Sequence, residues 1–117
     1  MKKKLPKIEN TLMGEFYKEY LDLQIIEEEN AFISYGIIED KCHIEDLYIR
    51  KGYRKLGLGS SLADKVTVIA KECGCTKLTT YSEKSSPGCK VATKAFLAYG
   101  FDIVDESEEH IYFEKKI

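Results

Sequence analysis

The spacing of apolar residues changes abruptly at one glycine-containing turn near the middle of the chain. Residues 42–49 alternate in the manner of a strand, whereas the apolar residues of 62–73 recur at helical spacing. The segment between them includes Arg54-Lys55-Leu56-Gly57-Leu58-Gly59-Ser60. A strand that continues through such a turn into a helix indicates a mixed α/β fold.

This turn also has the properties of an anion-binding site. The first turn of a helix has backbone N–H groups without intrahelical partners, and these groups point outward toward a phosphate. Gly57 and Gly59 leave that backbone accessible, and Arg54 and Lys55 add positive charge where the helix dipole already favours an anion. We expect a di- or polyphosphate ligand here. The alternative, that the two glycines only form a tight turn, stays open.

Two other phosphate-binding motifs do not fit the turn. A dinucleotide fingerprint requires a third glycine where this chain has Leu62. A P-loop requires a lysine after its last glycine, where this chain has Ser60.

The remaining elements are predicted from periodicity. Strands are expected at 23–28, 31–38, 42–49, 77–81, 101–105 and 110–114, and the short polar turns between the first three imply an antiparallel meander. Helices are expected from three apolar stripes: Leu12, Phe16, Tyr20 and Leu21; Leu62, Val66, Ile69 and Cys73; and Val91, Ala92, Ala95, Phe96 and Tyr99. Asn10 and Ser86 are the expected N-caps, with Pro87 in the first turn and Gly74 and Gly100 at helix ends.

The composition excludes several classes of protein. A chain of 117 residues is expected to form one domain over 1–117, and 44% hydrophobic with 32% charged residues is typical of a globular protein. The net charge of −2 gives no general attraction to nucleic acid or to a membrane surface. No apolar run has the length of a signal peptide or a membrane span, so we expect a cytoplasmic protein.

The cysteines and histidines do not form a recognisable metal or disulfide pattern. Cys42, Cys73, Cys75 and Cys89 are too irregularly spaced for a disulfide framework and are read as reduced thiols. The two histidines stand too far apart in sequence to argue for a shared metal ion, and no metal is expected.

Two segments resemble the GCN5-related N-acetyltransferase (GNAT) family. Residues 47–62 place Arg54, Gly57 and Gly59 in the spacing of that family's motif A, [RQ]-x-x-G-x-[GA]. Residues 92–101 read Ala-Thr-Lys-Ala-Phe-Leu-Ala-Tyr-Gly-Phe and resemble its A-x-x-x-[YF]-x-x-x-G-F segment. Two such motifs in the expected order are far more specific than either alone.

The resemblance implies a fold, a cofactor and a set of contacts. The fold would be a mixed, mostly antiparallel sheet split into a V and flanked by helices, with acetyl-CoA (coenzyme A) bound in the V. The pantetheine arm would pair with the backbone of Leu47, Tyr48 and Ile49. The pyrophosphate would lie on the N–H groups of the turn, which comprises Arg54, Lys55, Leu56, Gly57, Leu58, Gly59 and Ser60.

Two departures from the family pattern fall in the second motif. Phe96 stands where members often have a tyrosine that protonates the leaving thiolate, and Cys89 stands where they often have asparagine. Both are included in the expected cofactor site. Cys89, near a helix start, is either a reactive thiol or a packing residue.

The candidates for catalysis lie on the strand before the turn. Alternation predicts that His43, Glu45, Leu47 and Ile49 face one side and that Cys42, Ile44, Asp46 and Tyr48 face the other. By the same resemblance, positions 43 and 45 match the general bases of family members. His43 and Glu45 are therefore the candidate general bases, acting through a water, unless they are only half-exposed strand residues.

The sequence thus predicts an N-acetyltransferase that transfers acetyl from acetyl-CoA to a primary amine by direct attack in a ternary complex. The acceptor would be a small molecule or a protein, without nucleic acid or membrane, and a homodimer is left open. Two alternatives remain: a non-catalytic acyl-CoA-binding sensor or regulatory module, and a binder of another nucleotide phosphate.

Overall fold

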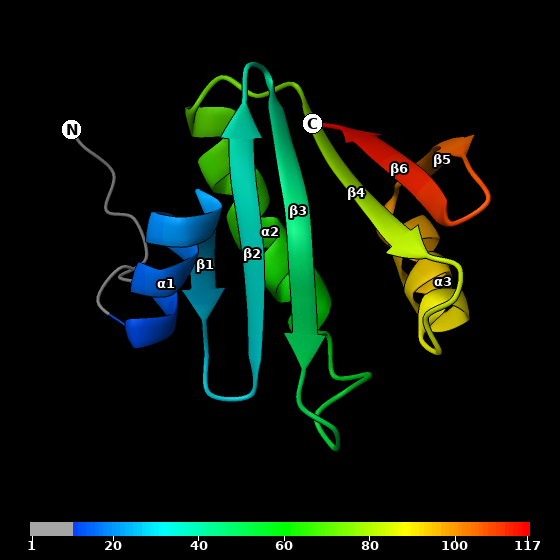
Figure 1. Cartoon of the computed structure of the whole chain (residues 1–117), viewed down its shortest axis with the longest axis horizontal. Helices are drawn as coiled ribbons and strands as arrows, with labels where there is room; N and C mark the ends of the chain where they lie inside the picture. Colours follow the sequence, from blue (N-terminus) through cyan, green and yellow to red (C-terminus); the bar gives the residue numbers. More distant parts are fainter. Residues whose placement is uncertain (1–10) are drawn as a thin grey trace.

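The computed structural model describes residues 11–117, which form three helices and six strands (Figure 1). Their order is α1 (Leu12–Leu21), β1 (Gln24–Glu27), β2 (Ala31–Ile38), β3 (Lys41–Ile49), α2 (Leu58–Glu72), β4 (Lys77–Glu83), α3 (Cys89–Tyr99), β5 (Asp102–Glu106) and β6 (His110–Lys116). The order along the sheet is β1-β2-β3-β4-β6-β5. Every described pair is antiparallel except β3 with β4, so the predicted meander of the first three strands is confirmed.

The parallel pair divides the sheet into two halves. β3 and β4 pair at only three positions, Lys41↔Lys77, Cys42↔Leu78 and His43↔Thr79. Beyond the third pair the two strands diverge, and Figure 1 shows the V that opens between them. The first half comprises β1, β2 and β3, and the second comprises β4, β6 and β5.

The hydrophobic core joins α2 to both halves of the sheet. Leu62 and Val66 of α2 are fully buried, as are Ile33 of β2, Cys42 of β3 and Leu78 of β4. Phe113 of β6 belongs to the same buried cluster. Ile69 is also buried, but Cys73, which was predicted on the same stripe, is the exposed C-cap of α2. Gly74 follows it with φ +84°, as expected for a helix end.

Helix α1 is present, but the prediction of its apolar face is wrong. Leu12, Phe16, Tyr20 and Leu21 are all exposed, whereas Met13 and Tyr17 pack against the core and Gly14 is buried. The expected cap Asn10 lies outside the described residues. Thr11 caps the helix instead, because its hydroxyl accepts a hydrogen bond of 2.8 Å from the N–H of Gly14.

Helix α3 begins later than the sequence predicts. Its N-cap is Gly88, without a side-chain cap bond, so Ser86-Pro87 precedes the helix and does not open it. Of its predicted inner face, Phe96 and Tyr99 pack against the core while Val91 and Ala95 are exposed. Within residues 11–117, no helix has the length and apolar character required to cross a membrane.

Candidate functional site

The glycine-containing turn leads from the end of β3 directly into α2. Gly57 is the N-cap of α2 and has φ +82°, in the left-handed region that glycine adopts without strain. Lys55 also has a positive φ, +65°, which is uncommon for a residue with a side chain. These two residues bend the chain so that α2 starts at the mouth of the V.

The start of α2 is open to an anion. The N–H of Ser61 is the first to bond within the helix, to the carbonyl oxygen of Gly57 at 3.0 Å. The N–H groups of Leu58, Gly59 and Ser60 precede it and have no acceptor in the helix. The helix has no side-chain cap and no acidic residue in its first turn, so nothing in that turn competes with a bound anion.

Gly59 is not required by packing in the free protein. A Cβ atom at this position would lie 3.6 Å from Cδ2 of Leu47, an ordinary van der Waals distance. A small side chain would therefore fit the fold at this position.

Arg54 anchors the turn to the strand that precedes it. Its Nε–H donates to the carbonyl oxygen of Ile49 at 2.9 Å, and its guanidinium carbon lies 5.8 Å from the centroid of the Tyr48 ring. The bond uses one of five guanidinium donors and fixes the positive charge where β3 ends.

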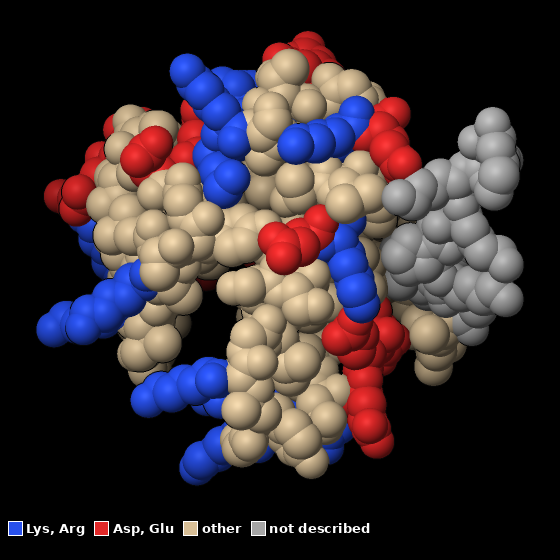
Figure 2. All heavy atoms as spheres, turned by 180° about the vertical axis from the view of Figure 1, so that it is seen from behind, with Lys and Arg blue, Asp and Glu red and all other residues tan. Residues whose placement is uncertain are grey.

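The β3 edge that faces the V is free of strand partners beyond the third pair. The first carbonyl past that pair, on Ile44, accepts a bond of 3.0 Å from the buried Thr80 hydroxyl. Further along, Leu47, Tyr48 and Ile49 pair only with β2 among residues 11–117. Figure 2, which views the molecule from behind, shows it hollowed between the two halves, with Lys and Arg side chains projecting nearby.

A β-bulge at Glu45 changes which side chains share a face of β3. Tyr35 of β2 is opposite Ile44 but the adjacent Ser34 is opposite Asp46, so Glu45 is the extra residue. The predicted alternation is therefore wrong beyond this point. Two sets of contacts show the change: Leu47 lies against Gly59 and Ile49 packs on the core, while Asp46 bonds to Tyr17 and Tyr48 contacts Phe32.

The structure brings the two candidate bases together. Nε2 of His43 and Oε1 of Glu45 are 3.3 Å apart, and about a third of each side chain is exposed. Nδ1 of His43 lies 2.8 Å from Oγ1 of Thr79, on the facing strand β4. The pair therefore stands where β3 and β4 separate, accessible from solvent.

Tyr81 joins this pair, although sequence reasoning did not single it out. Its hydroxyl donates to Oε2 of Glu45 at 2.7 Å, and its ring stacks on the His43 ring at 5.8 Å between centroids. This hydrogen bond, with burial, raises the pKa of Tyr81 to about 12. The sequence pattern that could have indicated Tyr81 is the alternation of β4, which places Thr79 and Tyr81 on one side of that strand.

Asp46 is occupied by structural contacts rather than directed into the site. Its Oδ2 accepts from the Tyr17 hydroxyl at 3.2 Å and from the Ser34 hydroxyl at 3.0 Å. Burial and the nearby Asp46 raise the pKa of Tyr17 above its usual range. The contact ties α1 to the sheet beside the bulge.

The two residues expected from the second motif lie apart from the base pair. The Phe96 ring packs edge-on against Phe101 and Phe113, at 5.7 and 5.0 Å between centroids. Sγ of Cys89 lies 3.6 Å from the hydroxyl of Ser82. Neither residue contacts His43 or Glu45 through a described bond, and whether they touch a cofactor stays a prediction.

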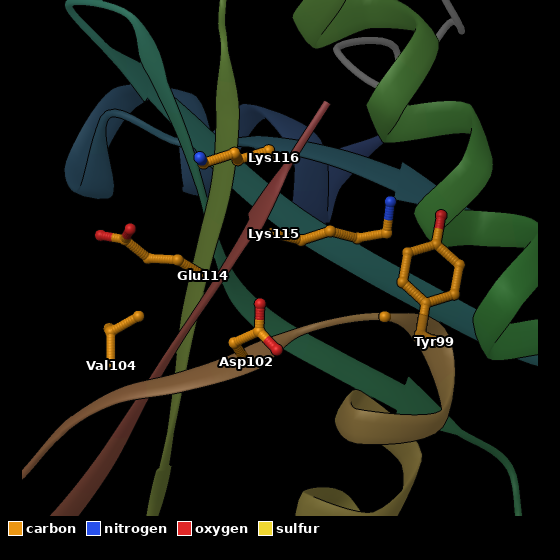
Figure 3. A pocket seen from close by; sticks show the side chains of 7 residues that line it. Tyr99, Asp102, Val104, Glu114, Lys115 and Lys116 are labelled. Carbon is orange, nitrogen blue, oxygen red and sulfur yellow. The ribbon is translucent and has the colours of Figure 1, made fainter.

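A cavity of about 630 Å³ lies elsewhere, where α3 ends beside β5 and β6. It is lined by Tyr99, Gly100, Asp102, Val104, Glu114, Lys115 and Lys116 (Figure 3). Lys115 extends toward Tyr99, with Nζ 5.7 Å from the ring centroid. Because it includes no residue of the turn or the base pair, we do not assign it to the predicted site.

Metal ligands do not gather in the described part of the chain. No group of three or more His, Cys, Asp or Glu side chains within residues 11–117 is arranged to hold a metal ion.

Comparison with known proteins agrees with this geometry. The sequence profile described as "Acetyltransferase (GNAT) family" matches residues 8–101. A search of curated proteins gave no match.

Many solved structures share the fold. A PaiA N-acetyltransferase from Thermoplasma acidophilum, in complex with coenzyme A, has a TM-score of 0.74 at 22% identity, over 91% of this chain and 69% of that one. A GNAT family acetyltransferase from Elizabethkingia anophelis with acetyl-CoA bound has a TM-score of 0.70 at 16% identity, over 88% and 82%. The ribosomal-protein-S18-alanine N-acetyltransferase from Escherichia coli has a TM-score of 0.64 at 14% identity, over 81% and 69%.

At these identities the structural neighbours establish the fold, and the profile establishes the family. Two of the three neighbours described above hold coenzyme A or acetyl-CoA, in agreement with the predicted co-substrate. The predicted fold class, a mostly antiparallel sheet split into a V, is confirmed. The match covers most of the length of the sequence, and the chain belongs to the acetyltransferase (GNAT) family.

Proposed function

We propose that this protein is an N-acetyltransferase that transfers acetyl from acetyl-CoA to a primary amine by direct attack in a ternary complex. The observation that carries the proposal is the arrangement along one strand. The His43–Glu45 pair, the unpaired edge at 47–49 and the uncapped start of α2 follow one another along β3 and its turn. A thioester held along that edge would place its phosphates on the turn and its carbonyl near the base.

The proposed reaction balances without a metal or an oxidant. The protonated amine first loses a proton to the base through a water, and its neutral nitrogen then attacks the thioester carbonyl carbon. The C–N bond forms and the C–S bond breaks, so that coenzyme A leaves as a thiolate, and the nitrogen releases its second proton to solvent as the amide forms.

The thiolate leaves without a dedicated acid in this proposal. Phe96 has no hydroxyl, and Tyr81, with a pKa of about 12, is a poor proton donor to a thiolate whose reference pKa is about 8.5. A leaving group of this acidity accepts its proton from solvent.

The acceptor is proposed as an amine of a small molecule or a protein. The Escherichia coli neighbour is named for an alanine of ribosomal protein S18, but at 14% identity that likeness concerns the fold. We place the protein in the cytoplasm as part of the proposal, because its four cysteines are free thiols.

The test is release of free coenzyme A from acetyl-CoA in the presence of polyamines, aminoglycosides, amino acids and peptide N-termini. An enzyme releases thiol at a rate that depends on one class of amine and yields its acetylated product by mass spectrometry. Tight binding of acetyl-CoA with no release above the uncatalysed rate would favour the sensor module, for which Phe96 is the supporting observation. Tighter binding of ATP or NAD than of coenzyme A would contradict both.

A further inference from the structure

The contact between Tyr81 and Glu45 crosses the split in the sheet. The last backbone pair between the halves is His43↔Thr79, and the Tyr81–Glu45 bond lies two residues further along each strand. Side chains therefore connect β3 to β4 at a point where their backbones have parted.

Glu45 depends on such contacts more than an ordinary strand residue does. As the extra residue of the bulge, it has no partner in the β2 register, so regular pairing does not fix its direction. Tyr81 holds Oε2 and His43 approaches Oε1. An ionised carboxylate has about four acceptor positions, so about two remain for water or an amine.

The same contacts decide the hydrogen positions on His43. An ionised carboxylate only accepts, so the proton of a neutral His43 is assigned to Nε2, which faces Glu45 at 3.3 Å. Nδ1 then accepts from the Thr79 hydroxyl at 2.8 Å. Both ring nitrogens are engaged, whereas Glu45 keeps free lone pairs.

Resting on the proposed function, we propose that Tyr81 is a positioning residue that orients Glu45, and that Glu45 rather than His43 accepts the proton of the acceptor amine. The proton passes from the amine nitrogen through a water to a free lone pair of Glu45, leaving a neutral carboxylic acid. It returns to solvent after the acetylated product departs. His43, whose ring is held by Thr79, stays beside Oε1 of the carboxylate throughout.

Several other titratable groups lie near the contact between Tyr81 and Glu45. Glu83, from β4, and Asp46, beside the bulge, act electrostatically on Tyr81, and Asp46 and Glu45 act on Tyr17 of α1. The His110 ring of β6 makes an edge contact with the Tyr81 ring, at 5.3 Å between centroids. A titration seen in the variant experiments must be checked against these groups.

The variant Tyr81→Phe keeps the ring on His43 and removes only the hydroxyl. We expect kcat with an identified amine to fall by about tenfold, in line with loss of one hydrogen bond to a charged group. The acid limb of kcat against pH should move to higher pH, and the KM for acetyl-CoA should stay unchanged. Tyr99→Phe is the matched control, because it removes a tyrosine-to-carboxylate bond of 2.6 Å to Asp64 away from the site.

Two measurements on the free protein test the contact without turnover. In Glu45→Gln the Tyr81 phenol should titrate below pH 12 by NMR of labelled tyrosine, since the negative charge that its hydroxyl faces is gone. The ¹⁵N spectrum of His43 should show the Nε2–H tautomer in the wild type. An Nδ1–H tautomer, or an unmoved Tyr81 titration, overturns the assignment.

The outcomes separate the two proposals. Turnover with an unshifted acid limb in Tyr81→Phe, or an equal shift in Tyr99→Phe, overturns the positioning role alone. A protein with the expected tautomer and phenol titration that releases no coenzyme A with any amine overturns the proposed function instead.

Discussion

A β-bulge in the pairing of β2 with β3 determines the position of Glu45. The bulge inserts it between Ile44, which is buried, and Asp46, which is bonded to α1. Its carboxylate is therefore free to turn toward the split, where a side chain from each half contacts it. A charge in this position is paired yet one-third exposed, so it does not carry the full cost of a buried ion.

The first prediction separates the roles of the two candidate bases. Glu45→Gln should lower kcat by a factor of about 10² to 10⁴, the usual effect of losing a general base. His43→Gln should lower it by much less, on the order of tenfold, because it removes a support and leaves the carboxylate. Raising the pH should partly restore Glu45→Gln, since more of the amine is then deprotonated in solution.

Acetyl-CoA affinity by calorimetry is the control for both variants and should not change, because the proposed cofactor contacts lie at 47–49 and 54–60. A larger loss in His43→Gln than in Glu45→Gln would reverse the assignment. Wild-type rates in both variants across pH 6 to 9 would leave deprotonation to solvent.

For single residues, the sequence could predict the pair His43 and Glu45 but not the contact of Tyr81 with that pair. His43 and Glu45 stand two residues apart on one strand, so alternation alone predicted that they meet. Tyr81 is 36 residues from Glu45 in sequence, and its contact depends on the β3–β4 register, which local patterns do not contain. The faces of residues 46–49 were mispredicted because one bulge shifts every later side chain.

Among the elements, α2 combines a buried body with a start that we propose binds the cofactor. Leu62 and Val66 anchor its body in the core, whereas its first turn has no side-chain cap and no negative charge. Helix starts usually acquire an Asp, Ser or Thr cap, and α2 instead begins at a left-handed glycine. We expect a bound anion to stabilise this end of the helix.

The second prediction is that Gly59→Glu separates binding from stability. A carboxylate in the first turn interacts favourably with the helix dipole by about 0.3–1 kcal/mol, and replacing glycine within a helix adds about as much again. The melting temperature should therefore hold or rise while acetyl-CoA binding is lost, because the carboxylate repels pyrophosphate and blocks the backbone. Calorimetry and thermal unfolding of the same preparation measure the two effects.

Gly59→Ala is the matched control for that variant. Its Cβ would meet only Cδ2 of Leu47 at 3.6 Å, so the fold should accept it and binding should weaken without being abolished. Unchanged affinity in folded Gly59→Glu would remove the turn from the cofactor site.

The elements themselves were predictable because each has a clear period and clear turn residues. The face of α1 was not, since two apolar stripes interleave on it and periodicity cannot rank them. In the structure the buried face contains Gly14, and Met13 and Tyr17 pack against the core. Helix α3 starts later than predicted because Gly88, and not Ser86, is its N-cap.

Across the whole molecule, two groups in different environments keep their protons to unusually high pH. Burial, then the neighbouring Cys75 and Cys73, raises the pKa of Cys42 from 9.0 to about 12. The bond to Glu45 raises that of Tyr81 from 10.0 to about 12. Both groups lie in β3 or β4, near the seam that joins the two halves.

The third prediction is a loss of stability in alkali. Between pH 9 and 12 the unfolded chain has released the Cys42 proton while the folded chain still holds it, so stability falls as pH rises. Each such group contributes a slope of up to about 1.4 kcal/mol per pH unit. Tyr81 adds to the fall above about pH 10. Urea unfolding at pH 8, 9, 10 and 11 measures the sum.

Cys42→Ala should flatten the part of that slope which begins near pH 9, and Cys89→Ala, whose thiol is not among the groups that act on Cys42, is its control. A urea midpoint that stays constant from pH 8 to pH 11 would show that the Cys42 thiol ionises alike in both states.

The seam between β3 and β4 has only three residue pairs, so the two strands pair along only part of their length. Beyond the third pair, the edge of β3 has backbone donors and acceptors that pair with no strand of residues 11–117 on that side. A ligand that lies along this edge acts as a temporary strand, and its affinity becomes part of the folding free energy. At a ligand concentration of 100 times Kd that linkage amounts to about 2.7 kcal/mol. If acetyl-CoA pairs with this edge, its addition should slow amide hydrogen exchange at residues 46–49. The ligand would then take the place of a neighbouring strand.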